Sequence, residues 1–323
     1  MITEQKSDMA VLLIAYRRTD HVKIILEICK RNMVSKIYIA LDGAKPGSES
    51  GQIDNFEIRR LVEEFEKHFS GEVKRLFRDR NVGCAASVLS ACDWIFENEE
   101  SAAILEDDCI PNDDFFDFSR QTLSYMGSDP NIWLSCGTQF SPSSLHYDSW
   151  LLSSYALTWG WATSSKNWES ISQAFKLQKE FDKNVSISAW ERTYWNQGAR
   201  RAQSGWVDVW DTILLQQMRV HKKMAILPKF PLVTNVGNDT SATHTHGQSP
   251  WLHLDTGGFS KPLDIPLFSL SNDSWLRRNL FTISPRHIFS TKVTALIDFL
   301  KRNRLPMPPL LDRWKLAEKD RLR

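Results

Sequence analysis

The first hundred residues alternate short apolar runs with stretches of helical periodicity, and this alternation constrains the fold more than any other feature. Apolar runs with the length of buried strands occupy residues 11–15, 36–41 and 102–105, and residues 73–77, which include two basic residues, are expected to form a shorter strand. Stretches with apolar residues three or four apart, as in amphipathic helices, occupy residues 22–29, 56–69 and 84–96. Such alternation predicts an α/β fold with a mostly parallel central sheet, flanked by helices and joined by right-handed crossovers.

The length of the chain sets its domain organisation. At 323 residues with 42% hydrophobic content, it is long enough for one large α/β domain with a packed core. We expect this domain to span residues 1–255. Residues 256–323 are loop-rich at first and then regain helical periodicity over residues 285–304, so we expect a C-terminal extension with a helical appendage.

Charge and cysteine content narrow the partners and the compartment. A net charge of +1 argues against nucleic acid as a partner. Five cysteines without CxxC spacing fit a reducing compartment. The opening residues lack a secretory signal pattern, and no apolar run approaches the length of a membrane span, so we expect a cytoplasmic protein. The basic tail after residue 300 suits either peripheral contact with the inner membrane face, where lipid-linked acceptors lie, or an ordinary solvated helix end.

The apolar run 102–105 ends in three consecutive acids, Glu106, Asp107 and Asp108. Burying a charge costs several kcal/mol of folding free energy unless the charge is paired or bound to a metal. Three acids at the end of a core strand therefore do not stabilise the fold. Ligands of open α/β sheets bind at the carboxyl ends of strands, and Mg²⁺ or Mn²⁺ prefers one or two carboxylates with water and phosphate oxygens. The run therefore predicts a metal and diphosphate site; the alternative is a solvated acidic turn before the next helix.

Polar side chains also follow the other three strands. Arg18, or its neighbour Arg17, is placed after the first strand to contact a base or phosphate. Asp42 follows the second strand and is placed to accept hydrogen bonds from a base or ribose. After the third strand come Arg78, Arg80 and Asn81, just before a helix whose N-terminus attracts anions. Together these loops predict a nucleotide-diphosphate cradle, although surface loops are commonly rich in such residues.

Several short motifs in order carry a family resemblance. Leu105-Glu106-Asp107-Asp108 is followed by Pro111-Asn112-Asp113-Asp114-Phe115-Phe116-Asp117-Phe118, then by residues 129–133, Trp159-Gly160-Trp161, Trp210-Asp211 and His246-Gly247-Gln248. Over residues 10 to 250 the chain resembles the N-acetylglucosaminyltransferase I family. The resemblance implies a GT-A-like nucleotide-diphospho-sugar transferase fold and transfer with inversion at the anomeric carbon. By length, bacterial polysaccharide glycosyltransferases of this fold are the closer analogy.

The resemblance also implies individual roles. Asp108 would be the direct ligand of Mn²⁺ or Mg²⁺, while Glu106 and Asp107 would hold the ribose or sugar of the donor. Arg18 and Asp42 would bind the nucleotide.

Asp211 would be the catalytic base under the same resemblance, with Asp208 as the second candidate. The apolar residues around Asp211 can shield a carboxylate and raise its basicity. The alternative is that Asp208 or Asp211 caps a helix over residues 212–220, a common use of Asp.

Two further segments have an open interpretation. Trp161, with Trp159, is expected to form the floor of a sugar pocket or to pack in the core. Residues 235–247 are small, polar and turn-prone, which suits a loop closing over nucleotide. Within them, His246 is expected to contact the diphosphate, with a metal role for His244 and His246 as the alternative.

We therefore expect a metal-dependent inverting glycosyltransferase that moves a hexosyl or N-acetylhexosaminyl group from a UDP-linked donor to a glycan or lipid-linked saccharide hydroxyl, in cell-surface polysaccharide synthesis. One alternative is a sugar-1-phosphate nucleotidyltransferase, which normally opens with a glycine-rich loop that residues 15–20 lack. The other is a non-catalytic glycan-binding or scaffold protein.

Overall fold

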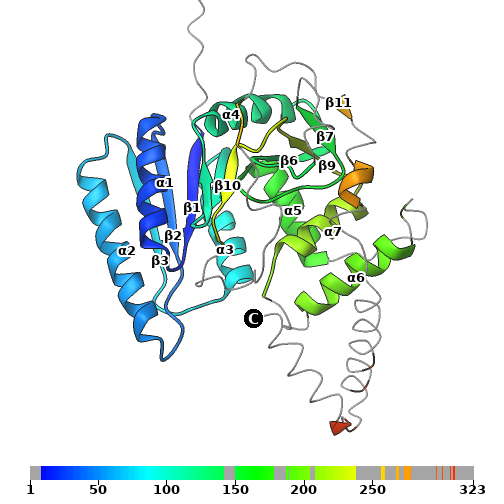
Figure 1. Ribbon diagram of the computed structural model, residues 1–323, viewed down its shortest axis with the longest axis horizontal. Helices are drawn as coiled ribbons and strands as arrows, with labels where there is room; N and C mark the ends of the chain where they lie inside the picture. The colour runs from blue at the N-terminus through cyan, green and yellow to red at the C-terminus, as the bar shows by residue number, and fades with distance from the viewer. Residues whose placement is uncertain are drawn as a thin grey trace, which may run out of the picture.

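The protein is an α/β structure built on one large sheet (Figure 1). The computed structural model describes residues 9–141, 150–177, 187, 189–203, 208–237, 256–258, 267–268 and 273–277, with 296, 300, 306, 308 and 309. Within these ranges the sheet has nine strands in the order β11-β7-β9-β6-β8-β4-β1-β2-β3. Most neighbouring pairs are parallel, and helices flank both faces, so the predicted fold class is confirmed.

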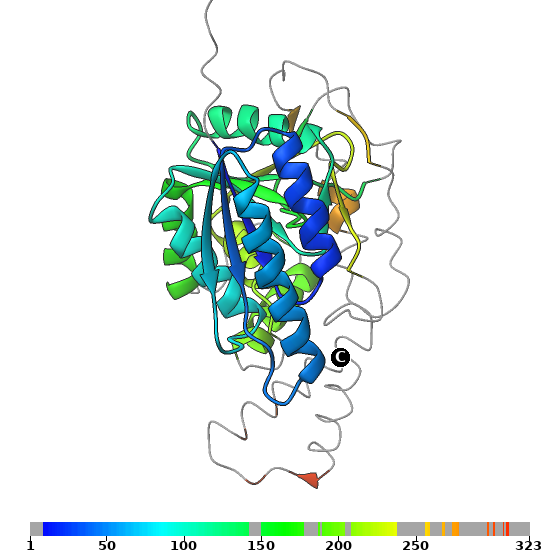
Figure 2. The same cartoon turned by 90° about the vertical axis from the view of Figure 1, so that its left-hand side faces the viewer.

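The N-terminal half supplies four parallel strands with helical crossovers. Its elements are β1 (Ala10–Ala15), α1 (Thr19–Arg31), β2 (Lys36–Leu41), α2 (Glu49–Lys67), β3 (Glu72–Phe77), α3 (Cys84–Phe96) and β4 (Ser101–Glu106). Alternate residues of the buried strand β1 face opposite sides of the sheet: Val11 and Leu13 pack with α1 and α2, and Leu12 packs with α3. Figure 2 shows α1 and α2 together on one face.

The second half continues the sheet with mixed strand directions. Its elements are β5 (Cys109–Pro111), α4 (Asp114–Met126), β6 (Ile132–Cys136), β7 (Leu151–Ser153), β8 (Trp161–Ser164), α5 (Ser165–Leu177), α6 (Ala189–Gln203), α7 (Asp211–Val220), β9 (Met224–Leu227), β10 (Val233–Asn235) and β11 (Leu267–Phe268). Strand β8 is antiparallel to both of its neighbours, β4 and β6. Strands β5 and β10 form a separate antiparallel pair beside the end of β4.

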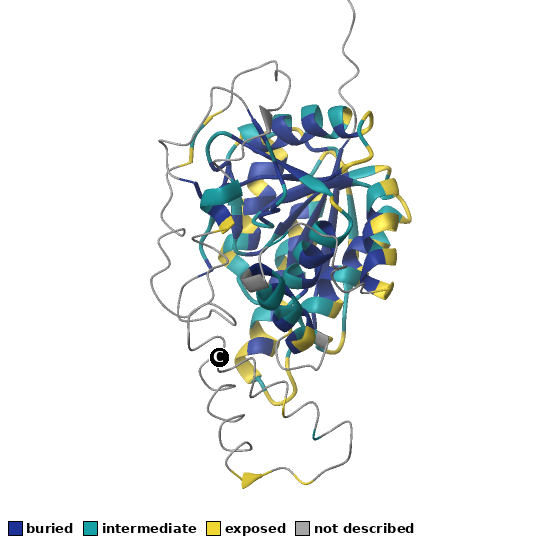
Figure 3. Cartoon of the chain, turned by 90° about the vertical axis from the view of Figure 1, so that its right-hand side faces the viewer, coloured by how far each residue is buried: buried dark blue, intermediate teal, exposed yellow. Residues whose placement is uncertain are grey.

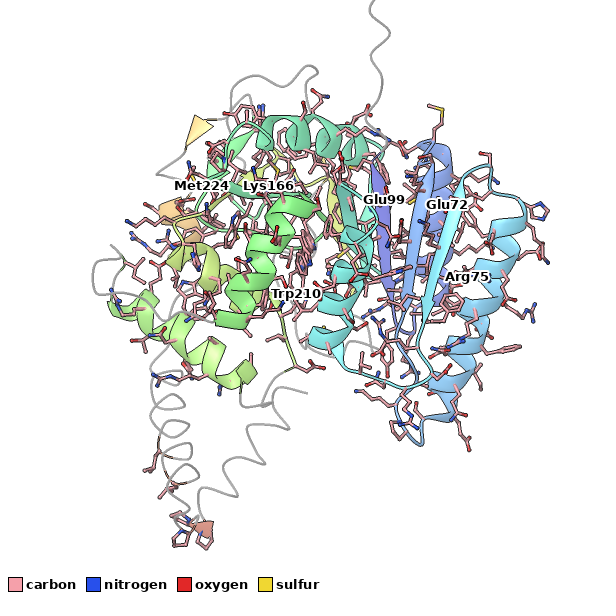
Figure 4. All side chains as sticks on the ribbon, turned by 180° about the vertical axis from the view of Figure 1, so that it is seen from behind. Glu72, Arg75, Glu99, Lys166, Trp210 and Met224 are labelled. Carbon is pink, nitrogen blue, oxygen red and sulfur yellow. The ribbon has the colours of Figure 1, made fainter. Side chains whose placement is uncertain are left out.

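The core and the sheet edge follow the sequence pattern. The central strands β1, β2, β4 and β6 are mostly buried, and the outer helix faces are exposed (Figure 3). Edge strand β3 carries Glu72 and Arg75, labelled in Figure 4, and such charges discourage pairing with another chain. Helix α2 begins at Glu49, earlier than its apolar pattern predicts, because the Ser48 hydroxyl accepts a hydrogen bond from the Gly51 N–H at 3.1 Å.

Part of the expected C-terminal extension joins the sheet domain. Strand β11 pairs parallel with β7, and Leu276 is buried in the core. The Asp273 carboxylate accepts hydrogen bonds from the Ser153 hydroxyl at 2.5 Å and the Ser154 N–H at 3.0 Å. Residues 267–268 and 273–277 therefore pack with the sheet, although they lie beyond residue 255, where the sheet domain was expected to end. The helical appendage over residues 285–304 and the basic tail lie almost entirely outside the described residues. Among the helices that are described, none is both long and apolar enough to cross a membrane.

Candidate functional site

Asp107 joins the end of β4 to the loop after β1. Its carboxylate is buried and accepts hydrogen bonds from the backbone N–H groups of Tyr16 at 2.8 Å and Arg17 at 3.2 Å. Its other oxygen lies 2.7 Å from Nη1 of Arg18, in an ion pair that is largely shielded from water. Two residues expected to bind the donor, Arg18 and Asp107, therefore bind each other, and this pair shapes the acidic turn.

Asp108 lies next to the segment that follows β10. Its backbone carbonyl accepts a hydrogen bond from the Val236 N–H at 2.8 Å, and a Cβ on Gly237 would collide with its carboxylate. Nη1 of Arg18 is 3.6 Å from Oδ2 of Asp108, and the Cys109 thiol donates to Oδ1 at 3.4 Å. The side chain keeps 23% of its surface exposed. Asp108 thus has both a position fixed by these contacts and access to a ligand.

Glu106 is surrounded by like charge. Burial, followed by the negative charges of Asp108, Asp211 and Asp107, raises the pKa of Glu106 well above its ordinary value. Burial and the charge of Asp107 likewise raise the pKa of Asp108. Asp211 is more than a hundred residues away along the chain, so the fold brings its carboxylate into electrostatic reach of the end of β4.

Cys84, the first residue of α3, lies among the same carboxylates. Burial, followed by the charges of Glu106, Asp208, Asp211 and Asp108, raises the pKa of its thiol. Cys84 was not among the site residues predicted from the sequence. The available signal was its place at the start of a helix, directly after a loop at the end of a strand.

Asp208 caps α3, a helix far from it in sequence. Its Oδ2 accepts a hydrogen bond from the Cys84 N–H at 2.6 Å, and its Oδ1 accepts one from the Ala85 N–H at 2.9 Å. Gly83 has φ +90°, and a Cβ there would collide with the Asp208 carboxylate. The expected anion at the N-terminus of α3 is therefore a side chain of the protein itself. Asp208 does cap a helix, but it is α3 and not the following helix.

Asp211 is the first residue of α7. Trp210 occupies the N-cap position without a side-chain cap hydrogen bond, and Oδ1 of Asp211 accepts from the N–H of Thr212 at 2.6 Å. Trp210 is buried and its ring packs against Trp161, with ring centroids 5.5 Å apart. Trp210, at the start of α7, is labelled in Figure 4. Asp211 therefore binds an N–H group of the first turn of α7, which agrees with the helix-cap alternative, and it also lies near the carboxylate cluster of Glu106, Asp107 and Asp108.

Asp42 holds together the loops after β2 and β3. Its buried carboxylate accepts hydrogen bonds from the Gly43 and Val82 N–H groups and from the Asn81 amide, at 2.9 to 3.0 Å. The Asn81 amide also donates to the Gly43 carbonyl at 2.9 Å. Arg80 is exposed, and its backbone lies directly against Gly43. The predicted residues Asp42, Arg80 and Asn81 do come together, with Arg80 as the side chain that faces solvent.

Trp161 lies in the core. It is 1% exposed, sits opposite Ile104 in the sheet and packs against Trp168 and Trp210. This favours the packing alternative over direct sugar contact. Trp159, which is half-buried and packs on Phe140, is the more accessible indole of the pair. His246, like His244, lies outside the described residues.

The carboxylate cluster fits a cation that takes few protein ligands. In the part of the chain that the structure describes, no group of three or more His, Cys, Asp or Glu side chains is arranged to hold a metal ion. Mg²⁺ and Mn²⁺ bound with a nucleotide need only one or two carboxylates, because phosphate oxygens and water complete the shell. Partly exposed Asp108 suits such an ion, as does the concentration of negative charge that, after burial, raises the pKa of Glu106.

Comparisons with known proteins add little to this geometry. No protein-family model and no curated protein sequence matches the chain. Similar solved structures include the inositol-1-phosphate CTP transferase from T. maritima, with 11% identity and a TM-score of 0.37, covering 72% of this chain and 90% of that chain.

A UDP-glucose pyrophosphorylase complexed with UDP-glucose has 8% identity and a TM-score of 0.34, covering 69% of this chain and 90% of that chain. The 4-diphosphocytidyl-2C-methyl-D-erythritol synthase from Anaerococcus prevotii has 7% identity and a TM-score of 0.32, covering 55% and 80%. Likeness at this level carries no argument about activity, which has to come from the chemistry of the site.

Proposed function

We propose that the protein is a metal-dependent inverting glycosyltransferase that moves a hexosyl or N-acetylhexosaminyl group from a nucleotide-sugar donor to a hydroxyl of a glycan or lipid-linked saccharide. One observation supports this most: the carboxylate of Asp211 lies in electrostatic reach of Glu106, beside the acidic end of β4. Inverting transfer needs a carboxylate near the acceptor hydroxyl and positive charge at the leaving diphosphate. UDP as the nucleotide, and a place in polysaccharide synthesis, follow from the family resemblance.

Asp211 is the proposed base. It accepts the proton of the acceptor hydroxyl while that oxygen bonds to the anomeric carbon, and the bond from this carbon to the diphosphate oxygen breaks on the opposite side. A divalent cation at Asp108 would offset the negative charge that develops on the leaving diphosphate. Asp208 is the weaker candidate for the base because both of its oxygens already accept backbone N–H groups of α3.

The loops after β1, β2 and β3 form the proposed donor site. Arg80 is an exposed cation of this edge, so it is placed to bind phosphate, and Asp42 with Asn81 holds the loop that carries it. The Arg18–Asp107 ion pair positions Asp108, and through this contact Arg18 and Asp107 contribute to donor binding. Glu106, beside them, is placed to hold the donor's ribose or sugar.

A panel of nucleotide sugars tested by calorimetry, with and without Mn²⁺, measures the first part of the proposal. We expect one donor to bind only with Mn²⁺, and we expect nucleoside diphosphate to be released when an acceptor is added. Release of pyrophosphate from a nucleoside triphosphate and a sugar 1-phosphate would instead identify a nucleotidyltransferase. Binding of a glycan with no affinity for any nucleotide sugar would identify a non-catalytic protein.

A further inference from the structure

The contact between Asp208 and α3 joins two parts of the site that are separated by more than 120 residues in sequence. Both carboxylate oxygens of Asp208 bind backbone N–H groups at the first turn of the helix, and Gly83 leaves the room for them. Three residues later the chain reaches Asp211. On the other side, α3 follows the loop that Asp42 and Asn81 hold.

We propose that Asp208 is a positioning residue, which binds segment 208–211 to the N-terminus of α3 and thereby holds Asp211 against the carboxyl end of β4. The inference rests on the proposed function in that Asp211 is taken as the base. A carboxylate is well suited to the task because helix N-termini attract negative charge and have unpaired N–H groups. Asp208 itself exchanges no proton with substrate.

Two rival explanations predict different results. In the first, the buried ring of Trp210 against Trp161 holds Asp211 alone, and Asp208 has no effect on turnover. In the second, Asp208 is itself the base. Asparagine separates the second explanation from positioning, because its amide oxygen still accepts one of the two N–H groups, which Ala cannot do, whereas it cannot accept the acceptor's proton.

The kinetic experiment compares Asp208→Ala with Asp208→Asn in the full chain. We expect Asp208→Ala to lower kcat by about 10²-fold, the effect of a displacement of roughly 1 Å at a reacting group, with donor affinity unchanged. Asp208→Asn should keep most of the turnover. Unchanged kcat in Asp208→Ala, or equal loss in both variants, would overturn the proposal.

Cys84 offers a measurement that needs neither donor nor acceptor. The other four cysteines are buried, so alkylation of the folded protein reports on the half-exposed Cys84. Burial and the carboxylates around it raise the pKa of its thiol and so suppress the thiolate, and Asp208 and Asp211 are two of these carboxylates. Asp208→Asn removes one charge, whereas Asp208→Ala also releases segment 208–211. We therefore expect the alkylation rate to rise from wild type to Asp208→Asn and further to Asp208→Ala; equal rates in the two variants would contradict positioning.

Gly83→Ala approaches the same contact from the helix side. Its Cβ would occupy the space of the Asp208 carboxylate, so it should raise Cys84 alkylation as Asp208→Ala does. The double variant should be no faster than Asp208→Ala, because Asp208→Ala already removes both the charge and the contact that Gly83→Ala disturbs. Additive rates would show two independent effects and overturn the inference.

Ser48→Ala is the matched control. It removes the side-chain cap of α2, a helix on the opposite face of the sheet, and should lower stability without changing kcat or Cys84 alkylation. Failure of the proposed function can be told apart from failure of the positioning role. If no transferase activity is found, the Cys84 alkylation rates still test whether Asp208 positions segment 208–211. If activity is found but the alkylation rates do not differ between the variants, only the positioning role is rejected.

Discussion

Nη1 of Arg18 lies 2.7 Å from Oδ1 of Asp107, and this buried ion pair joins the loop after β1 to the end of β4. The two strands are neighbours in the sheet, so the pair closes the gap between their carboxyl ends. Because Oδ2 of Asp107 also accepts backbone N–H groups, the arrangement is a structural support for the partly exposed carboxylate of Asp108.

Removal of one partner should therefore be costly. Asp107→Ala leaves the buried guanidinium of Arg18 without its main counter-charge, and we expect the free energy of unfolding to fall by about 3–5 kcal/mol in urea titration. Asp113→Ala breaks the exposed ion pair with Arg31 and should change stability little. Similar losses in both variants would contradict the buried-pair account.

Asp108→Ala tests the metal assignment. We expect nucleotide binding to lose its dependence on Mn²⁺ while the fold stays intact, because the partly exposed carboxylate is the proposed ligand. Calorimetry with and without Mn²⁺ measures this, and circular dichroism checks the fold. Asp113→Ala, in the same acidic stretch, should keep the dependence. If Asp108→Ala binds nucleotide as strongly with Mn²⁺ as the wild type does, the assignment is wrong.

Asp211→Asn tests the base. Asn has nearly the same size, so stability and donor binding should persist while kcat falls by roughly 10²–10⁴-fold, the usual contribution of a general base. Steady-state kinetics with an identified acceptor measures the loss, and Asp208→Asn should be much milder. Near-normal turnover in Asp211→Asn with collapse in Asp208→Asn would transfer the role to Asp208.

Glu106 should make stability depend on pH. Its pKa in the folded protein lies well above the ordinary value of 4.5, because of burial and the nearby carboxylates. Between these two values the folded state binds more protons than the unfolded state, so the free energy of unfolding should fall as pH rises through this window.

Urea unfolding over a pH series measures the slope. In Glu106→Gln the fall should be shallower, so that the variant gains stability relative to wild type toward neutral pH. Glu57→Gln, which alters an exposed carboxylate of α2, should leave the slope unchanged. A slope that is equally steep in Glu106→Gln would show that other groups cause it.

Local patterns in the sequence were sufficient for the N-terminal half of the fold. The buried strands β1, β2 and β4 are short apolar runs, and the helices between them show amphipathic spacing. Because parallel strands present their carboxyl ends at one edge, the acids after β4 had to lie near Arg18 and Asp42. The prediction that these residues share one edge of the sheet follows from the alternation of strands and helices.

Other features depend on contacts that no local pattern encodes. The pairing of Ile104 with Trp161 places that indole in the core, although its sequence context suits a sugar pocket equally well. Strand β8 enters between β4 and β6 in the antiparallel direction, and the short run that forms it gives no sign of its neighbours.

The sequence by itself therefore determined which side chains meet at the carboxyl edge of the parallel strands, because the alternation of strands with helices is a local pattern, and crossover helices make the strands they join parallel. Only the tertiary structure decided what each carboxylate does there. Asp208 became the cap of α3, and Asp107 the partner of Arg18, through contacts that span 124 and 89 residues of chain. Such contacts form only when the whole sheet and its helices are packed, since a carboxylate's role depends on which donors the fold brings within hydrogen-bonding distance.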